Sequence, residues 1–297
     1  MRVFVTGATG LIGSAVVNDL IEAGHEVVGL ARSAEGAAKV EAAGAEVRRG
    51  TLHDLDVLRA AAEAADGVIH TAYIHNFADL AASAGADKLA IEAFGEVLAG
   101  SDRPLVVSSG TALHAGHGLA TEESEIPDPL PVTRYSEQTA LAFADKGVRA
   151  SSIRLAPTVH GEGDRNFMPL LITLAREKGA AAYIGEGANV WPAVHRLDAA
   201  RLYRLALESA PAGARLHAVA EQAIPFRLIA ETIGRRLNLP VKSVSGAEAE
   251  EYFGWFALFA GIDNPASSEY TQRLLGWRPE QVGLIEDLAG DYYFAQK

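Results

Sequence analysis

The 297-residue sequence contains no cysteine, and aromatic residues make up only 7% of it. Without cysteine the chain forms no disulfide bond, iron–sulfur cluster or thiolate zinc site, and it has no cysteine nucleophile. It also lacks an uncharged apolar run near the roughly 18–20 residues that a membrane-spanning helix needs. A predicted strand directly follows Met1, so we expect no signal peptide and a soluble, cytoplasmic protein.

Basic residues are outnumbered by acidic ones. The chain has 26 lysines and arginines against 38 aspartates and glutamates, a formal net charge of −12. A negative surface repels nucleic acid and anionic membranes, and no basic cluster is denser than a pair such as Arg235-Arg236. We therefore expect no nucleic-acid partner and no membrane partner, but a small-molecule substrate.

The first half of the chain alternates short β-branched segments with alanine-rich ones. Six segments are predicted to be strands: Arg2–Thr6, Glu26–Ala31, Glu46–Arg49, Gly67–Thr71, Leu105–Ser108 and Ala150–Leu155. Five are predicted to be helices: Leu11–Ala23, Ala34–Ala43, Asp56–Ala64, Leu80–Leu98 and Ser136–Asp145. Apolar strands that alternate with helices are typical of a doubly wound parallel sheet. The sequence therefore predicts an α/β, Rossmann-like fold.

The alternation stops after Pro157 and returns briefly with a predicted helix, Asp198–Glu208, and a predicted strand, Arg215–Val219. The part of the chain after Ala220 is expected to form helices and loops. We therefore expect a dinucleotide-binding domain made of residues 1–157 and about 193–220. A smaller, discontinuous C-terminal substrate lobe comprises about 158–192 and 221–297.

A glycine-rich turn, Thr6-Gly7-Ala8-Thr9-Gly10-Leu11-Ile12-Gly13, follows the first predicted strand and opens the first predicted helix. Gly7 permits a tight turn, Gly10 lets the backbone approach a pyrophosphate, and Gly13 allows the helix to pack closely on the strand. The helix N-terminus favours the phosphate charge. We therefore predict that this turn binds a dinucleotide through Gly7, Thr9, Gly10, Leu11, Ile12 and Gly13.

The end of the second predicted strand bears on the choice of dinucleotide. An NAD site usually has an acidic residue there, which accepts a hydrogen bond from the ribose 2′-hydroxyl. This sequence has Arg32 and Ser33 instead, and no acidic residue between Glu26 and Glu35. Because a guanidinium and a hydroxyl suit a 2′-phosphate, the sequence favours NADP over NAD.

Further motifs accompany the glycine turn: Gly50-Thr51-Leu52-His53-Asp54, Val68-Ile69-His70-Thr71-Ala72, Val106-Val107-Ser108-Ser109, Val159-His160-Gly161-Glu162-Gly163-Asp164 and Val194-His195-Arg196-Leu197-Asp198. With these motifs the sequence resembles the extended, epimerase-like branch of the short-chain dehydrogenase/reductase superfamily. The resemblance runs from residue 6 to residue 198. The glycine turn is a specific motif, and the others support it.

The resemblance implies a cofactor site at the strand ends. It places Leu52 near the adenine, and Thr71, Ala72 and Tyr73 beside the ribose. It places Ser108 and Ser109 at the end of the strand that carries the catalytic hydroxyl, and the turn at Pro157 and Thr158 over the nicotinamide. Enzymes of this family usually have aspartate at the position of Thr51, so we expect one adenine contact to be missing.

The sequence departs from the family at the catalytic dyad, a tyrosine followed four residues later by a lysine on one helix. In that dyad the ammonium lowers the phenol pKa and holds the nicotinamide ribose. No lysine stands at the expected place, which leaves two registers open: Tyr135 with Thr139, or Thr133 with Glu137. The spacing also occurs at Tyr293 and Lys297, which we interpret as coincidence.

The predicted catalytic residues are Ser109 and Tyr135, with Thr111 as a weaker substitute for Ser109. Three interpretations stay open. In the first, Tyr135 protonates a carbonyl with help from Arg134 or Ser109. In the second another acid serves, and in the third the protein senses its cofactor without hydride transfer. The candidates for the other acid are Tyr73, His75, His114 and His160.

Other residues have weaker signals. His114 and His117 lack a carboxylate at fixed spacing, so we predict no metal. His195 and Asp198 stand at a helix start, where negative charge is favoured, and are expected to be structural. An aromatic stripe shares one helical face, which is typical of a helix in the core, and part of it would also suit the wall of an apolar substrate site. Its members are Tyr252, Phe256 and Phe259.

The predicted helices 80–98 and 136–145 carry many small residues, which allow close helix approach. In the resembling family the equivalent pair commonly forms a four-helix bundle between two subunits. A homodimer through this helix pair is one expectation, and simple packing of the two helices against the sheet is the alternative.

These features predict an NADP-dependent oxidoreductase, an atypical short-chain dehydrogenase/reductase, that transfers hydride to or from a small, fairly apolar carbonyl-type substrate. One alternative is a sugar-nucleotide epimerase or dehydratase, which a basic diphosphate clamp in the lobe would support. The other is a non-catalytic NADP-binding regulatory protein, which the missing lysine allows.

Overall fold

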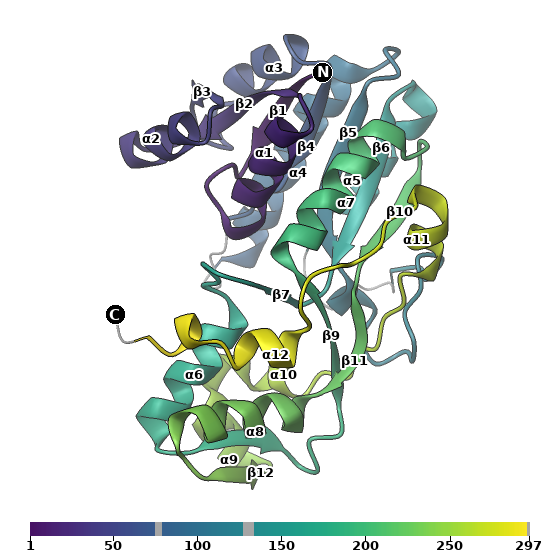
Figure 1. Ribbon diagram of the computed structural model, residues 1–297. Coiled ribbons are helices and arrows are strands. Elements are labelled where there is room, and N and C mark those ends of the chain that lie inside the picture. The colour runs from purple at the N-terminus through teal and green to yellow at the C-terminus, as the bar shows by residue number, and fades with distance from the viewer. Residues whose placement is uncertain (75–78, 127–133, 296–297) are drawn as a thin grey trace.

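Seven parallel strands form the larger sheet of the computed structural model, in the order β10-β6-β5-β4-β1-β2-β3 (Figure 1). The structure describes residues 1–74, 79–126 and 134–295. The strands are β1 (Arg2–Thr6), β2 (Glu26–Ala31), β3 (Glu46–Arg49), β4 (Gly67–His70), β5 (Pro104–Gly110), β6 (Arg149–Leu155) and β10 (Ala214–Ala218). All neighbouring strands run parallel, which confirms the predicted Rossmann-like sheet.

Helices cover both faces of this sheet. Successive side chains of a strand point to opposite faces, so the residues of β1 pack alternately against the two layers of helices. Val3 and Val5 of β1 lie in one buried cluster with α1 (Leu11–Glu22), α2 (Ala34–Ala42) and α7 (Arg196–Ser209). Phe4 lies in another with α3 (Leu55–Glu63), α4 (Leu80–Leu98) and α5 (Ser136–Leu141). The predicted helix 136–145 is interrupted, since a 3₁₀ turn, Ala144–Lys146, follows α5.

The smaller lobe contains two further sheets beneath the larger one (Figure 1). The first comprises β7 (Thr158–His160), β9 (Val190–His195) and β11 (Glu221–Pro225), and the second β8 (Ala181–Ile184) and β12 (Val241–Val244). The helices are α6 (Phe167–Lys178), α8 (Phe226–Leu237), α9 (Ala247–Phe253), α10 (Ala257–Ala260) and α12 (Leu284–Leu288). The expectation of only helices and loops after residue 220 is therefore wrong for β11 and β12.

A C-terminal segment returns to the larger sheet. Helix α11 (Glu269–Leu275) lies beside β10 (Figure 1), and Trp277 is fully buried in the same cluster as α1 and α7. The indole N–H of Trp277 donates to the carbonyl of Asp198 at 2.9 Å. The Asp198 carboxylate accepts the backbone N–H groups of residues 280 and 281, a structural role. This segment falls within the predicted lobe range 221–297, but its side chains pack against the larger sheet.

None of the helices in the described ranges combines the length and the apolar character that crossing a membrane requires.

Candidate cofactor and catalytic site

A cleft of about 630 Å³ opens at the carboxyl edge of the larger sheet. In doubly wound sheets this edge is where ligands bind. Most of the predicted cofactor residues line it: Gly7, Thr9, Gly10, Leu11, Ile12, Gly13, Arg32, Leu52, Thr71, Ala72 and Tyr73. The prediction did not include six other lining residues: Leu30, Gly50, Thr51, His53, Ile74 and Asn166. Asn166 follows β7 in a loop of the lobe, which no local spacing connects to the glycine turn.

Two glycines of the turn have no room for a side chain. Gly7 has φ +72°, and a Cβ there would lie 2.6 Å from Oγ1 of Thr71. A Cβ on Gly13 would lie 2.0 Å from the carbonyl oxygen of Gly7. Both close approaches hold α1 tightly against the ends of β1 and β4, so that the helix N-terminus faces the strand edge.

The same turn leaves its outer surface open toward the cleft. At Gly10 the nearest atom to an added Cβ is the Gly7 carbonyl at 3.3 Å, and no side chain caps the helix that starts at Leu11. Backbone N–H groups at such an uncapped N-terminus bind phosphate. The cleft volume also lies within the usual range for small-molecule and cofactor sites. The residues present therefore fit the pyrophosphate of a nicotinamide dinucleotide.

The end of β2 supplies a cation to this cleft. The Arg32 side chain is exposed and lines the cleft, and none of the described lining residues is acidic. Ser33 lies outside the lining set. Its hydroxyl accepts the backbone N–H of Gly36 at 3.0 Å and caps α2. Of the two residues predicted to bind the 2′-phosphate, Arg32 therefore lines the cleft, whereas the Ser33 side chain caps a helix.

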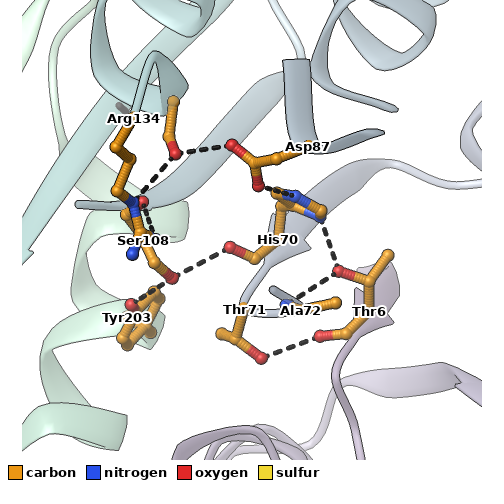
Figure 2. Close-up of polar contacts among 9 residues, drawn as sticks. Thr6, His70, Thr71, Ala72, Asp87, Ser108, Arg134 and Tyr203 are labelled. Atoms are coloured by element: carbon orange, nitrogen blue, oxygen red, sulfur yellow. Dashed lines mark hydrogen bonds and ion pairs between the residues drawn. The ribbon is translucent and has the colours of Figure 1, made fainter. Parts of the chain in front are cut away.

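A buried hydrogen-bond network begins at Thr6, which also contacts the cleft-lining residues Thr71 and Ala72 (Figure 2). Oγ1 of Thr6 is 2.7 Å from Nδ1 of His70, and Nε2 of His70 donates to Asp87 at 3.0 Å. The hydroxyl of Ser136 donates to the other Asp87 oxygen at 2.6 Å. Burial opposes ionisation of Asp87, but these hydrogen bonds and the charge of Arg134 hold its pKa below the usual value. Asp87 is therefore a carboxylate at neutral pH.

Ser108 and Arg134 extend this network across the ends of β5 and α5 (Figure 2). Ser108 donates its hydroxyl proton to the carbonyl of His70 at 2.9 Å, so the hydroxyl of Tyr203 donates to Ser108 at 2.6 Å. The guanidinium of Arg134 donates to the Ser108 carbonyl at 3.0 Å. Its carbon lies 4.4 Å from the ring centre of Tyr73, which lines the cleft. The Ser108 side chain is thus engaged inside the protein, outside the cleft lining.

The remaining predicted positions on the nicotinamide side are Ser109, Pro157 and Thr158. Ser109 is 3% exposed, and within the described part of the chain its hydroxyl has no hydrogen-bond partner. Thr158 is also buried, and its hydroxyl likewise has no hydrogen-bond partner among the described residues. Pro157 is half-buried. None of these residues belongs to the lining set, so the structure gives their predicted roles no direct support.

Tyr135 is not among the residues that line the cofactor cleft. Its side chain is 41% exposed and lines a separate surface pocket of about 340 Å³ with Lys88, Glu92, Gln138 and Thr139. In the other register the lysine position is Glu137, which is buried. Neither register therefore presents a lysine to the cleft. His75, Thr133 and Lys297 lie outside the described residues.

The histidines considered as acids are engaged elsewhere. Nδ1 of His114 lies 3.0 Å from the carbonyl of Glu125, and burial lowers the His114 pKa to about 4. With His117 this residue lines a pocket of about 140 Å³. His160 pairs with Asp287 at 2.7 Å. Among the described residues no group of three or more histidines and carboxylates could hold a metal ion.

The aromatic stripe of the lobe forms a cluster around Phe167, the first residue of α6. Its ring lies 4.9 Å from that of Phe256 and 5.6 Å from that of Phe259. Tyr252 packs against Phe253 in the same lobe and donates its hydroxyl to the carbonyl of Ala180. Of the predicted stripe, Phe256 and Phe259 contact Phe167, the neighbour of Asn166 in sequence.

The chain belongs to the NAD dependent epimerase/dehydratase family, which residues 3–219 match. An uncharacterized protein of Schizosaccharomyces pombe is 54% identical over 295 residues, which cover 99% of this chain and 100% of that protein. The 2′-dehydrokanamycin reductase of Streptomyces kanamyceticus is 29% identical, covering 98% and 80%.

A crystal structure of a dTDP-glucose 4,6-dehydratase from Streptomyces venezuelae with NAD bound has the same fold. The TM-score is 0.79 at 22% identity, over 99% of this chain and 97% of that one. Family membership makes a nicotinamide dinucleotide the expected cofactor, in agreement with the glycine turn and the cleft.

Proposed function

We propose that the protein is an NADP-dependent oxidoreductase that transfers hydride to or from a small, fairly apolar carbonyl-type substrate. The observation that carries the cofactor choice is Arg32, exposed in the cleft at the end of β2 among lining residues that include no carboxylate. A guanidinium forms paired, charge-assisted hydrogen bonds with a phosphate. The relative from Streptomyces kanamyceticus is named as a reductase, which supports hydride transfer with a carbonyl-type substrate.

A feature of the lobe supports the apolar substrate class. Asn166 lines the cleft, and the next residue, Phe167, packs against Phe256 in the aromatic cluster of the lobe. An apolar cluster this near in sequence to a cleft-lining residue favours an apolar substrate over the diphosphate of a sugar nucleotide, which needs cationic contacts.

Calorimetric titration with NADPH, NADP⁺, NADH and NAD⁺ tests the cofactor choice. We expect the two phosphorylated forms to bind more tightly, and Arg32→Ala to weaken only these by about 10- to 150-fold, the loss of one charge-assisted contact of ~1.5–3 kcal/mol. The matched control is Arg273→Ala, an exposed arginine on α11. Equal affinity for all four nucleotides would refute the NADP assignment.

Turnover needs a separate assay, a panel of apolar ketones and aldehydes followed by NADPH absorbance. Oxidation of NADPH with at least one of them supports the oxidoreductase. Tight NADPH binding without turnover on any member favours the non-catalytic, regulatory alternative. If none of the four nucleotides binds, the proposed function is wrong as a whole.

A further inference from the structure

We propose that Tyr73 and Arg134 together take the place of the missing tyrosine–lysine dyad. In this assignment the Tyr73 hydroxyl gives a proton to the substrate oxygen, and the Arg134 guanidinium over its ring stabilises the phenolate that remains. The inference rests on the proposed function, because it requires a carbonyl that is reduced in this cleft. Its first test, however, concerns only the chain itself.

The position of Tyr73 meets the first requirement, a phenol at the cofactor cleft. Tyr73 comes three residues after the end of β4, and it lines the cleft together with Thr71 and Ala72. These neighbours contact the glycine turn directly, since Oγ1 of Thr71 donates to the carbonyl of Thr6 at 2.8 Å. The side chain of Tyr73 therefore projects from the same strand end that holds the turn in place. Tyr135, by contrast, lines a different pocket.

Arg134 meets the second requirement, a cation fixed beside the phenol. Its Nε donates to the hydroxyl of Ser136 at 3.1 Å, and a terminal nitrogen donates to the carbonyl of Ser108 at 3.0 Å. Ser136 is itself anchored to the buried carboxylate of Asp87 at 2.6 Å. Contacts to groups of α5 and β5 thus hold the guanidinium over the Tyr73 ring. Because these contacts already fix the side chain, little conformational entropy is lost in placing it there, whereas a mobile surface arginine would lose more.

The charges act in the required sense. Burial raises the pKa of Tyr73, so the phenol is protonated at neutral pH and has a proton to give. The charge of Arg134 opposes part of this rise, because a cation near the ring favours the phenolate. Asp87 acts in the opposite direction on Tyr73, and hydrogen bonds with His70 and Ser136 occupy both its oxygens.

The proton transfer balances as follows. When bound in the cleft, a dihydronicotinamide would supply the hydride for the carbonyl carbon. As the carbonyl oxygen gains negative charge, the O–H bond of Tyr73 breaks and a new O–H bond forms on the substrate, which becomes an alcohol. The phenolate stays beside Arg134 until water returns a proton to it.

A 3,5-difluorotyrosine placed at position 73 tests the pair without cofactor or substrate. This analogue titrates nearer neutral pH than tyrosine, and its ¹⁹F resonance reports ionisation of this one ring. We expect Arg134→Gln to move the titration midpoint to higher pH, and Arg134→Lys, which keeps the charge, to leave it closer to the parent. The control Arg273→Gln should not move it. An unchanged midpoint in a folded Arg134→Gln protein overturns the proposal.

The second test uses the turnover assay of the proposed function. Tyr73→Phe should lower kcat by about 100-fold or more with little change in KM or in NADPH affinity. Tyr270→Phe, on the surface of α11, is the control. Turnover that survives in Tyr73→Phe overturns the pair while leaving the proposed function intact. Failure of the wild type to bind NADPH would refute the proposed function, and the fluorine titration would still decide whether Arg134 controls Tyr73.

Discussion

Both carboxylate oxygens of Glu137 accept hydrogen bonds from the guanidinium of Arg154, at 2.7 and 2.8 Å. Glu137 is 3% exposed and Arg154 is fully buried, so the ion pair lies inside the larger domain between α5 and β6. In one of the two registers considered for the catalytic dyad, Glu137 stands where the family has its lysine. In that register, the position that holds the nicotinamide ribose in the family is occupied here by a residue of an internal ion pair.

The first prediction concerns Glu137→Gln. The substitution leaves the buried guanidinium of Arg154 without its main countercharge, which typically costs about 3–5 kcal/mol of the free energy of unfolding. Urea denaturation at pH 7 measures this loss. The matched control is Glu231→Gln, which breaks an exposed pair with Arg227 of similar length, 2.7 Å, and should change stability little. Equal losses in the two variants would show that burial does not determine how much an ion pair contributes to the free energy of unfolding.

The same pair predicts a dependence on acid. Burial opposes ionisation of Glu137, but the hydrogen bonds and charge of Arg154 outweigh it and keep the pKa of Glu137 below its ordinary value. For a carboxyl with a lowered pKa, the stabilisation is complete above the unfolded value and is lost as pH falls toward the folded one. The difference between wild type and Glu137→Gln should therefore shrink below about pH 4.5. A difference that stays constant down to pH 3 would contradict this assignment.

Asp164 should behave in the opposite way. Burial raises its pKa to about 6, against the hydrogen bonds from the Asn166 backbone and the Tyr293 hydroxyl. The folded chain then holds a proton that the unfolded chain has released, so stability falls as pH rises from about 4 to 6. Asp164→Asn keeps the acceptor for the Asn166 backbone N–H and removes the charge. It should be more stable than wild type at pH 7, by on the order of 2 kcal/mol, and equal to it at pH 4.

Thermal or urea unfolding at both pH values checks this second prediction. The control is Asp145→Asn, a change of the same kind at an exposed position after α5. An Asp164→Asn protein that gains nothing on going from pH 4 to pH 7 would rule out a buried, protonated carboxyl at this site.

The larger sheet could be predicted because each of its strands carries the signal locally. Phe4 and its neighbours Val3 and Val5 are apolar on both faces, as a parallel strand covered on both sides requires. The strands of the lobe could not be predicted in the same way. β7 has three residues and β9 contains Pro192, which weighs against a strand because it cannot donate to the ladder.

The cofactor side of the site was predictable for a similar reason, and the catalytic side was not. Gly7, Gly10 and Gly13 act through a turn whose geometry their spacing encodes. Arg134 and Tyr73 stand 61 positions apart, and the ring contact between them depends on how α5 meets β4. No local sequence pattern predicts such a contact. The same holds for the contact of Ser108 with Tyr203, whose partners are 95 positions apart.

The third prediction compares two helical glycines. In Gly13→Ala the added methyl group would lie 2.0 Å from the Gly7 carbonyl, so the turn must open and nucleotide affinity should fall by more than tenfold. In Gly85→Ala, on α4, nothing lies within 4 Å of the added Cβ. That variant should gain up to about 1 kcal/mol of stability from helix propensity alone and keep its nucleotide affinity. Calorimetry and urea denaturation of both variants decide, and unchanged NADPH binding in Gly13→Ala would refute the assigned role of the turn.

The last prediction concerns how the C-terminal segment is joined to the larger domain. Trp277 is fully buried against α1 and α7 and donates to the Asp198 carbonyl, whereas Trp255 in the lobe is 54% exposed. Trp277→Phe removes the hydrogen bond and leaves unfilled volume, which should cost about 2–4 kcal/mol. Trp255→Phe should cost far less. Because Trp277 ties the segment to the main core, urea unfolding of Trp277→Phe followed by circular dichroism should shift as one transition to lower urea. Equal midpoints for the two variants would show that the segment adds no stability to the larger domain.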